Sequence, residues 1–392
     1  SNYCVDVSFI DKCELCYEVV ACTECYNLRY AVNSHNCIDS AFLRNCRACR
    51  NCFGCVNLVS KQYCYFNKQL SKAEYERAIA SHDLGARSQV QALGDRFEQF
   101  RLDFPYKYMI GEQNENVTGN SVFSSRDSHD CFDASEVWDC NYCSWFHQAK
   151  DCMDCFSWGF PAELCYECVE VGGGSYQSAF SVTVVNSQQI YYCYQAYNSK
   201  NCFGCVATKK NEHFILNRQY SAAEYEKMVA RIISHMQTTG EWGEFFPMSI
   251  TPLCYNASVA QDYQPIDSEL AKMLHVPWHD ESSHAPTPSK KVAIADSISD
   301  IADEICSQVL TCSVSGRPFK LTKAELAYYR KHRIAPPDVA FVERHRARLR
   351  KRNPRMLWER VCTGCGATLQ TSFPPWAPEK VVCEECYRKE MY

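Results

Sequence analysis

The chain has 392 residues, of which 46% are hydrophobic, and it is long enough for two or three domains. No apolar run approaches the roughly 18 residues of a membrane span and no signal peptide is visible, which argues against a membrane protein and favours a cytoplasmic one. The net charge of −5 conceals an asymmetry, because the residues from Cys306 onward carry +9 and the remainder carries −14. An acidic body with a basic tail predicts that the tail meets something anionic.

The 28 cysteines are far more than an ordinary globular protein carries. They indicate either a secreted disulfide framework or a reduced protein that uses thiols as core residues and metal ligands. Disulfide scaffolds are usually short chains that lack a core, and this chain is long. We therefore favour the reduced, intracellular interpretation.

The first segment, from Cys4 to Asn67, repeats with a period of twelve residues. One column of the repeat has cysteine in four successive turns, at Cys13, Cys25, Cys37 and Cys49. A short fixed period with small or apolar residues in the same columns predicts a β-solenoid, in which each turn stacks on the previous one. Pairs with CxxC spacing, such as Cys13 and Cys16, would also suit zinc, but their recurrence with the repeat favours a ladder of thiols used as filler.

A second segment repeats the first with an offset of 150 residues. The motif NCFGCV occurs at residues 51–56 and again at 201–206. Each copy is followed by a capping box, at Ser71–Glu74 and Ser221–Glu224, which predicts a helical cap on each solenoid. The predicted helices are 72–81, 86–101 and 222–239.

Beyond Trp242 the repeat pattern dissolves and prolines break regular structure. We predict an extended arm that packs across the body through its aromatic residues, which are Phe245, Phe246, Tyr255 and Tyr263. Ser282–Lys291 has the composition of a flexible linker. A third capping box, Thr322–Glu325, predicts a helix from Lys323 to about Arg333.

These patterns predict a mainly β protein: a two-lobed cysteine-rich solenoid with helical caps, followed by a small α+β zinc-ribbon domain. The predicted domains are residues 1–105 (first lobe), 106–240 (second lobe), 241–300 (arm and linker) and 301–392 (basic helices and zinc ribbon).

The strongest chemical signal is a pair of CxxC motifs separated by seventeen residues, at Cys362, Cys365, Cys383 and Cys386. Four thiolates at this spacing are typical of a tetrahedral Zn²⁺ site. Four protein ligands leave no open position for substrate or water, so we predict one structural zinc ion. Two disulfides or free thiols are the alternative.

A basic segment precedes the first of these motifs, with seven Lys and Arg residues among the twelve positions 344–355. We expect a helix from Val339 to Lys351 whose inner face holds Phe341, Ala347 and Leu349. Such a charge density beside a zinc ribbon suits phosphate contacts. The predicted nucleic-acid-binding residues are Arg344, Arg346, Arg348, Arg350, Lys351, Arg352 and Arg355. A helix that docks on the acidic body of the same chain, or one that is simply solvated, remains an alternative.

The chain resembles a family of uncharacterised cysteine-rich zinc-ribbon proteins found in candidate-phylum bacteria with small genomes. The resemblance is carried by motifs along most of the chain: NCFGCV with the following NKQ and capping box, His235–Pro247, Gly316–Phe319, Arg352–Arg355, the two CxxC pairs and the final CEECY. The resemblance implies a β-solenoid followed by a zinc ribbon, and it implies no established activity. Some relatives carry a further ribbon before the solenoid, which implies a missing N-terminal segment here.

One departure from the family pattern is informative. Relatives often carry a first ribbon whose four thiols would stand at 312, 315, 340 and 343, where this chain has Cys312, Ser315, Ala340 and Glu343. The resemblance therefore implies a half-domain that keeps its fold by packing and holds no metal.

For function we predict a non-enzymatic binding protein, in which the ribbon and basic segment contact RNA, DNA or a ribonucleoprotein, with RNA slightly favoured. The alternative is an assembly scaffold that binds another protein through a solenoid face or edge. An enzyme or a thiol-based metal or redox store is a third, weaker hypothesis. No histidine, nucleophile and acid form a recognisable motif, Gly172–Gly174 lacks the Lys and Ser or Thr of a phosphate loop, and no small-molecule substrate is evident.

Overall fold

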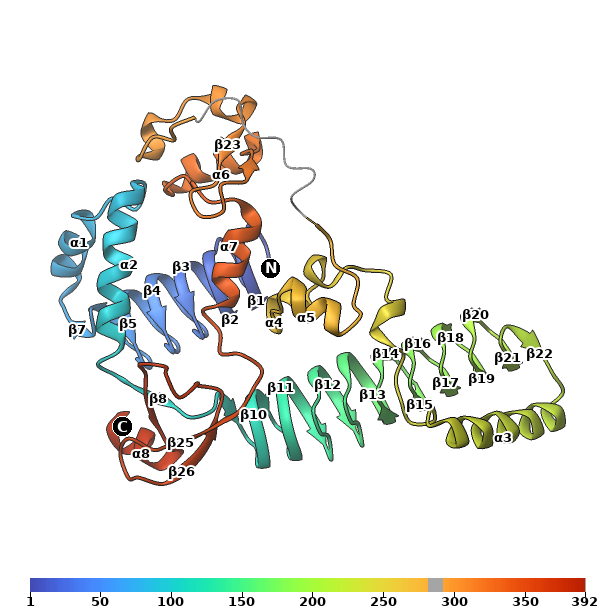
Figure 1. The fold of residues 1–392 in the computed structure, drawn as a ribbon. Helices are drawn as coiled ribbons and strands as arrows, with labels where there is room; N and C mark the ends of the chain where they lie inside the picture. The colour runs from blue at the N-terminus through green and yellow to red at the C-terminus, as the bar shows by residue number, and fades with distance from the viewer. Residues whose placement is uncertain (281–291, 392) are drawn as a thin grey trace.

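The computed structural model describes residues 1–280 and 292–391, apart from the side chains of residues 157–164 (Figure 1). The predicted linker Ser282–Lys291 lies outside the described residues. The fold is mixed α/β, with many short parallel strands in repeated sheets, rather than mainly β as the repeats predicted. Figure 1 shows two elongated stacks of strands, blue and green, that meet beside the C-terminal ribbon.

The first stack is a seven-stranded sheet in which each strand pairs in parallel with the strand one turn later, up to a final antiparallel pair. Val5 lies beside Tyr17 and Val7 beside Val19, so the repeat is twelve residues, as predicted. Its strands are β1 (Val5–Asp11), β2 (Tyr17–Thr23), β3 (Tyr26–Val32), β4 (Ile38–Arg44), β5 (Arg50–Val56), β6 (Gln62–Tyr65) and β7 (Lys68–Gln69).

Within each turn the backbone repeats every three residues. Cys13, Cys16, Val19 and Cys22 all point into the buried core. A residue in the left-handed region follows each inward residue by two positions. Leu15, Glu18 and Ala21 are examples, with φ angles between 52° and 55°. Each turn therefore has four sides of three residues, and a CxxC pair consists of two neighbouring inward positions.

The inward thiols fill the core and hydrogen bond to the backbone. Cys46 Sγ lies 3.5 Å from the carbonyl oxygen of Arg44 and 3.4 Å from that of Cys55 on the next turn. Ser34 stands one turn earlier in the same column and donates its hydroxyl to Val32 O at 3.2 Å. A small side chain with a donor therefore suits these positions, and the described cysteines of the stack are free thiols.

The second stack follows the same pattern with interruptions. The register of its parallel strands shifts once in the pair β10–β11 and once in the pair β12–β13. Beyond β13 each turn contributes two shorter strands instead of one. Its strands are β9 (Gly111–Glu112), β10 (Glu115–Phe123), β11 (Arg126–Trp138), β12 (Ser144–Lys150), β13 (Phe156–Tyr166), β14 (Val169–Gly172), β15 (Tyr176–Ala179), β16 (Val182–Val185), β17 (Gln188–Tyr191), β18 (Tyr194–Tyr197), β19 (Lys200–Phe203), β20 (Val206–Lys209), β21 (Glu212–Ile215) and β22 (Arg218–Gln219).

Both stacks end on the predicted helical caps. Ser71 and Ser221 each form a complete capping box at the start of α1 (Lys72–Ala80) and α3 (Ala222–Thr239). The glycine of the repeated NCFGC motif allows the last turn of each stack to approach closely, because a Cβ on Gly54 would lie 2.8 Å from the Phe66 ring and one on Gly204 would lie 2.9 Å from Leu216. A second helix, α2 (Arg87–Arg101), adds Leu93 and Phe97 to the apolar cluster over the first stack.

The arm is more structured than predicted. It contains the short helices η1 (Met248–Ile250), η2 (Tyr255–Ala257), α4 (Ala260–Tyr263) and α5 (Ser268–Met273). Tyr263 packs edge-to-face on Trp145 of the second stack, with ring centroids 5.6 Å apart, so this part of the arm does cross the body.

The C-terminal region contains the ribbon, a unit of short strands and one helix that carries the four clustered cysteines, and a similar unit before it. Its elements are η4 (Ile298–Asp300), η5 (Asp303–Ser307), β23 (Leu310–Thr311), β24 (Pro318–Phe319), α6 (Lys323–His332), α7 (Phe341–Leu349), β25 (Trp358–Val361), β26 (Thr368–Thr371), β27 (Lys380–Val382) and α8 (Glu384–Met391). Strand β27 pairs in parallel with β8 (Pro105–Lys107), which lies in the connection between the two stacks. Among the described residues, every helix is too short or too polar to span a lipid bilayer.

Candidate metal centre and basic segment

The four predicted cysteine ligands come together at the C-terminus. The sulfur atoms of Cys362, Cys365, Cys383 and Cys386 all lie within 4.8 Å of one another. Cys362 follows β25, Cys383 follows β27 and Cys386 lies in α8. Among the residues that the structure describes, no other group of three or more Cys, His, Asp or Glu side chains meets this distance. Four thiolates at this spacing fit a tetrahedral Zn²⁺.

The backbone around the cluster favours thiolates. Cys383 N donates to Cys362 Sγ at 3.2 Å, and Cys386 N donates to Cys383 Sγ at 3.4 Å. Burial raises the pKa of the Cys362 thiol, but the backbone N–H groups of Cys383, Cys365 and Gly364 lower it to about 6. Hydrogen bonding with the thiols of Cys383 and Cys365 raises the pKa of Cys386 to about 12. Four adjacent thiolates therefore need a bound cation to exist together at neutral pH.

The preceding unit repeats the geometry of the ribbon but keeps only one of the four thiols, that of Cys312. Cys312 N donates to Arg317 O, and Gly316 N donates to Cys312 O at 3.0 Å, as Gly366 N donates to Cys362 O at 2.9 Å. Ala340 N donates to Cys312 Sγ at 3.2 Å, in the place where Cys383 N donates to Cys362 Sγ. The half-domain implied by the family resemblance is therefore folded, and its α7 corresponds to α8.

The basic segment lies against the acidic body, and its arginines point inward. Arg348 is 1% exposed, and its Nη1 lies 3.1 Å from Asp6 and 2.9 Å from Glu18, two carboxylates of the first stack. Arg344 is 8% exposed and pairs with Asp6, and it donates to Tyr329 Oη at 3.0 Å. Burial lowers the pKa of Arg344, but Asp6 and Tyr329 reverse this and raise it above its usual value.

The predicted inner face of this helix is therefore wrong. Phe341 is 60% exposed and Ala347 is exposed, whereas Arg344 and Arg348 are buried. Helix α7 also spans Phe341–Leu349, shorter at both ends than predicted. Arginine ion pairs with a neighbouring acidic surface have replaced the apolar contacts that the pattern suggested.

The end of the segment contacts the second stack. Arg352 and Arg355 both pair with Asp133, the latter at 3.0 Å. The Arg352 guanidinium lies 3.9 Å from the ring centroid of Phe9 in the first stack, and that of Arg355 lies 4.6 Å from Trp145 in the second. The segment therefore joins the two stacks.

Three further residues were predicted to bind nucleic acid. Two of them form ion pairs with carboxylates, and the third is exposed. Lys351 pairs with Glu18 at 3.3 Å, and Arg346 pairs with Asp262 at 3.4 Å and with Glu343 at 3.2 Å. Arg350 is exposed, and no ion pair of its side chain occurs among the described residues. Sequence reasoning did not identify the acidic partners Asp6, Glu18 and Asp133, although the opposite charges of body and tail indicated that such partners exist.

No protein-family model matches the chain, and no curated protein matches it. The family resemblance therefore stays a prediction, and function is inferred from the geometry of the sites.

Proposed function

We propose that this protein is a non-enzymatic assembly scaffold, built from two β-solenoid lobes that are held together by the basic segment and by a ribbon with one structural Zn²⁺. The observation that supports this most is the burial of Arg348 between Asp6 and Glu18. A buried arginine held by two carboxylates of its own chain is not free to contact phosphates. Most of the charge expected to bind nucleic acid is instead used to fix the arrangement of the lobes.

The second lobe supplies the surface for a protein partner. Its outward column Val182, Tyr194 and Val206 runs over three successive turns in register. Tyr194 is 39% exposed and Val206 is 55% exposed. A rigid row of partly exposed apolar side chains is typical of a protein-binding face.

Nucleic-acid binding through the tail is the second candidate, and the exposure of Arg350 favours it. RNA fits better than DNA, because no helix of the described tail is shaped to read a major groove.

One experiment separates the two candidates. The full-length protein is purified at low salt from its own host, and bound polypeptides and nucleic acids are measured for the wild type, Arg350→Glu and Tyr194→Glu. The scaffold retains its partner in Arg350→Glu and loses it in Tyr194→Glu. Loss of bound RNA in Arg350→Glu, with a steep dependence of binding on salt, would favour the second candidate instead.

A further inference from the structure

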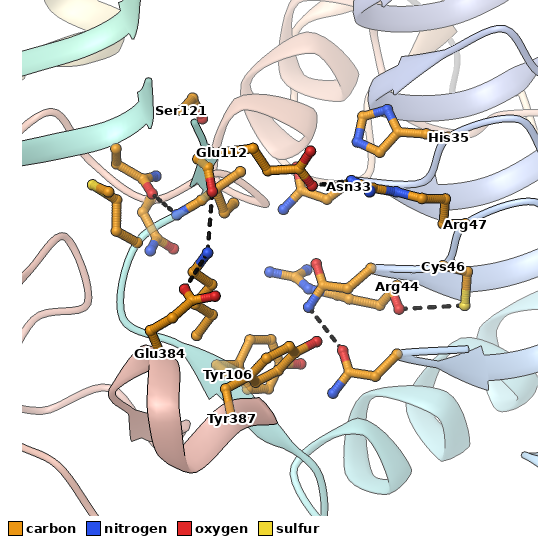
Figure 2. Close-up of a pocket in the computed structure, with 18 of the residues that line it drawn as sticks. Asn33, His35, Arg44, Cys46, Arg47, Tyr106, Glu112, Ser121, Glu384 and Tyr387 are labelled. Carbon is orange, nitrogen blue, oxygen red and sulfur yellow. Dashed lines mark hydrogen bonds and ion pairs between the residues drawn. The ribbon is translucent and has the colours of Figure 1, made fainter. Parts of the chain in front are cut away.

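A cavity of about 410 Å³ lies where the first stack, the connection between the stacks and the ribbon meet (Figure 2). Its walls include Arg44 and Asn45 from the first stack, Tyr106 from the connection, and Glu384 and Tyr387 from the ribbon helix α8. Cavities of this volume are typical of small-molecule sites. Three separate parts of the chain therefore enclose one polar hollow.

Arg44 is the anomalous residue of this cavity. It stands in an outward column of the first stack, and its neighbours in this column are valines, with Val32 one turn before it and Val56 one turn after. Those valines are 6% and 0% exposed, and Arg44 is 9% exposed. An arginine in a buried apolar column carries a large desolvation cost unless an anion compensates it.

No compensating anion is found among the described residues. Arg44 Nη2 is 3.5 Å from the backbone oxygen of Lys351, its guanidinium carbon is 5.6 Å from the ring centroid of Tyr106, and its Nε has no hydrogen-bond partner. Burial lowers the pKa of Arg44, with Tyr106 and the more distant Glu98 and Glu379 opposing the shift.

The two carboxylates that line the cavity already have cations. Glu112 pairs with Arg47, and Glu384 pairs with Lys107 and with Arg388. Figure 2 shows Arg44 extending into the cavity, with Arg47 and Glu112 on one side and Tyr106 and Tyr387 on the other. Of the cations that line the cavity, only Arg44 has no carboxylate partner among the described residues. The others, each of which has one, are Arg47, Lys107, Lys351, Arg352 and Arg388.

We propose that this cavity binds a small phosphorylated compound, with its phosphate group on the Arg44 guanidinium. The planar fork of arginine matches a phosphate oxygen pair, and the buried, uncompensated charge of Arg44 favours an anion at this place. The volume leaves room for an organic portion beside the phosphate. The wall also holds the amide side chains of Asn33, Asn45, Asn57 and Asn120, of which that of Asn57 is already bonded to Asn45 and to Pro105 O.

The test uses the full-length, zinc-loaded protein and three variants. Arg44→Val completes the valine column, so it should fold at least as well as the wild type without ligand. Arg44→Gln keeps a polar side chain without the charge. Arg50→Gln is the matched control, because Arg50 is an exposed arginine of the next strand and does not line the cavity. Binding of inorganic phosphate, adenosine monophosphate and citrate is measured by calorimetry and thermal shift in chloride buffer.

We expect phosphate and the nucleotide to bind the wild type and Arg50→Gln equally, and to bind Arg44→Val and Arg44→Gln at least about tenfold more weakly. The proposal is overturned if the wild type binds neither phosphate compound at millimolar concentration, if both Arg44 variants bind as the wild type does, or if citrate binds more tightly than either. A clear loss of unliganded stability in both Arg44 variants would also overturn it, since Arg44 would then be a structural residue.

Discussion

The buried ion pairs of Arg348 give a quantitative prediction about how the tail is held. In Arg348→Met the apolar stem remains and the guanidinium is lost, so Asp6 and Glu18 each lose one partner. Removing one partner of a buried ion pair costs about 3–5 kcal/mol. Asp6 keeps Arg344, and Glu18 keeps Lys351 at 3.3 Å, which places the expected cost near the lower end, at about 3 kcal/mol.

Hydrogen–deuterium exchange on the intact chain measures this directly. A loss of about 3 kcal/mol corresponds to a roughly hundredfold faster exchange of the α7 amides through local undocking. Exchange is more suitable than a global unfolding curve, because a chain with several folded units does not unfold in one step.

Two further variants make the reasoning refutable. Arg350→Met removes an exposed arginine of the same helix end and should change stability by no more than about 0.5 kcal/mol. The double change Arg348→Met with Glu18→Gln should cost less than the sum of the two single changes, because each single change already removes the ion pair that the two residues share. If Arg348→Met leaves the exchange of α7 unchanged, or if Arg350→Met accelerates it equally, the buried ion pairs do not hold the tail.

Three other predictions concern the cysteines. The purified wild type should contain one Zn²⁺ per chain by mass spectrometry, and it should lose the ion on acidification, because protons compete for the thiolates. Cys46→Ser should cost no more than about 1 kcal/mol in urea unfolding of the first stack, because Ser34 already serves in that column, whereas Cys46→Phe should prevent stable folding by overpacking. The triple variant Ser315→Cys, Ala340→Cys, Glu343→Cys should bind a second Zn²⁺ per chain, since the backbone of the unit around Cys312 matches that of the ribbon.

The large-scale repeat of this protein could be predicted from sequence because it is a property of local spacing. The twelve-residue register, the offset of 150 and the capping boxes at Ser71, Ser221 and Thr322 all appear in the structure. The sequence also carries a finer signal. From Cys4 to Cys64 every cysteine of the first stack occupies one frame of three residues, which by itself places every thiol on the inside and explains the CxxC pairs.

The position of the basic segment could not be predicted in this way. Its contacts join residues more than 200 positions apart, such as Arg352 and Asp133, and no local pattern encodes such pairs. Hydrophobic periodicity even gave the wrong inner face for α7, because it assumes that apolar residues are the buried ones. The charge asymmetry indicated that the tail would contact an anionic surface. It did not indicate whether that surface belongs to a nucleic acid or to the acidic body of the same chain.

The geometry of the two elements explains why this contact fits. Asp6 and Glu18 occupy the same left-handed corner on consecutive turns of the first stack, so they are separated by roughly 4.8 Å, the spacing of neighbouring strands. Arg344 and Arg348 are one helical turn apart, or about 6 Å along α7. The two spacings are similar, so a helix that lies across the turns can bring two successive arginines to two successive carboxylates. Arg344 pairs with Asp6, Arg348 pairs with both Asp6 and Glu18, and Lys351, just beyond the end of the helix, pairs with Glu18 again. The helix thus matches two turns of the first stack, and Arg352 then extends the contact to Asp133 on the second stack.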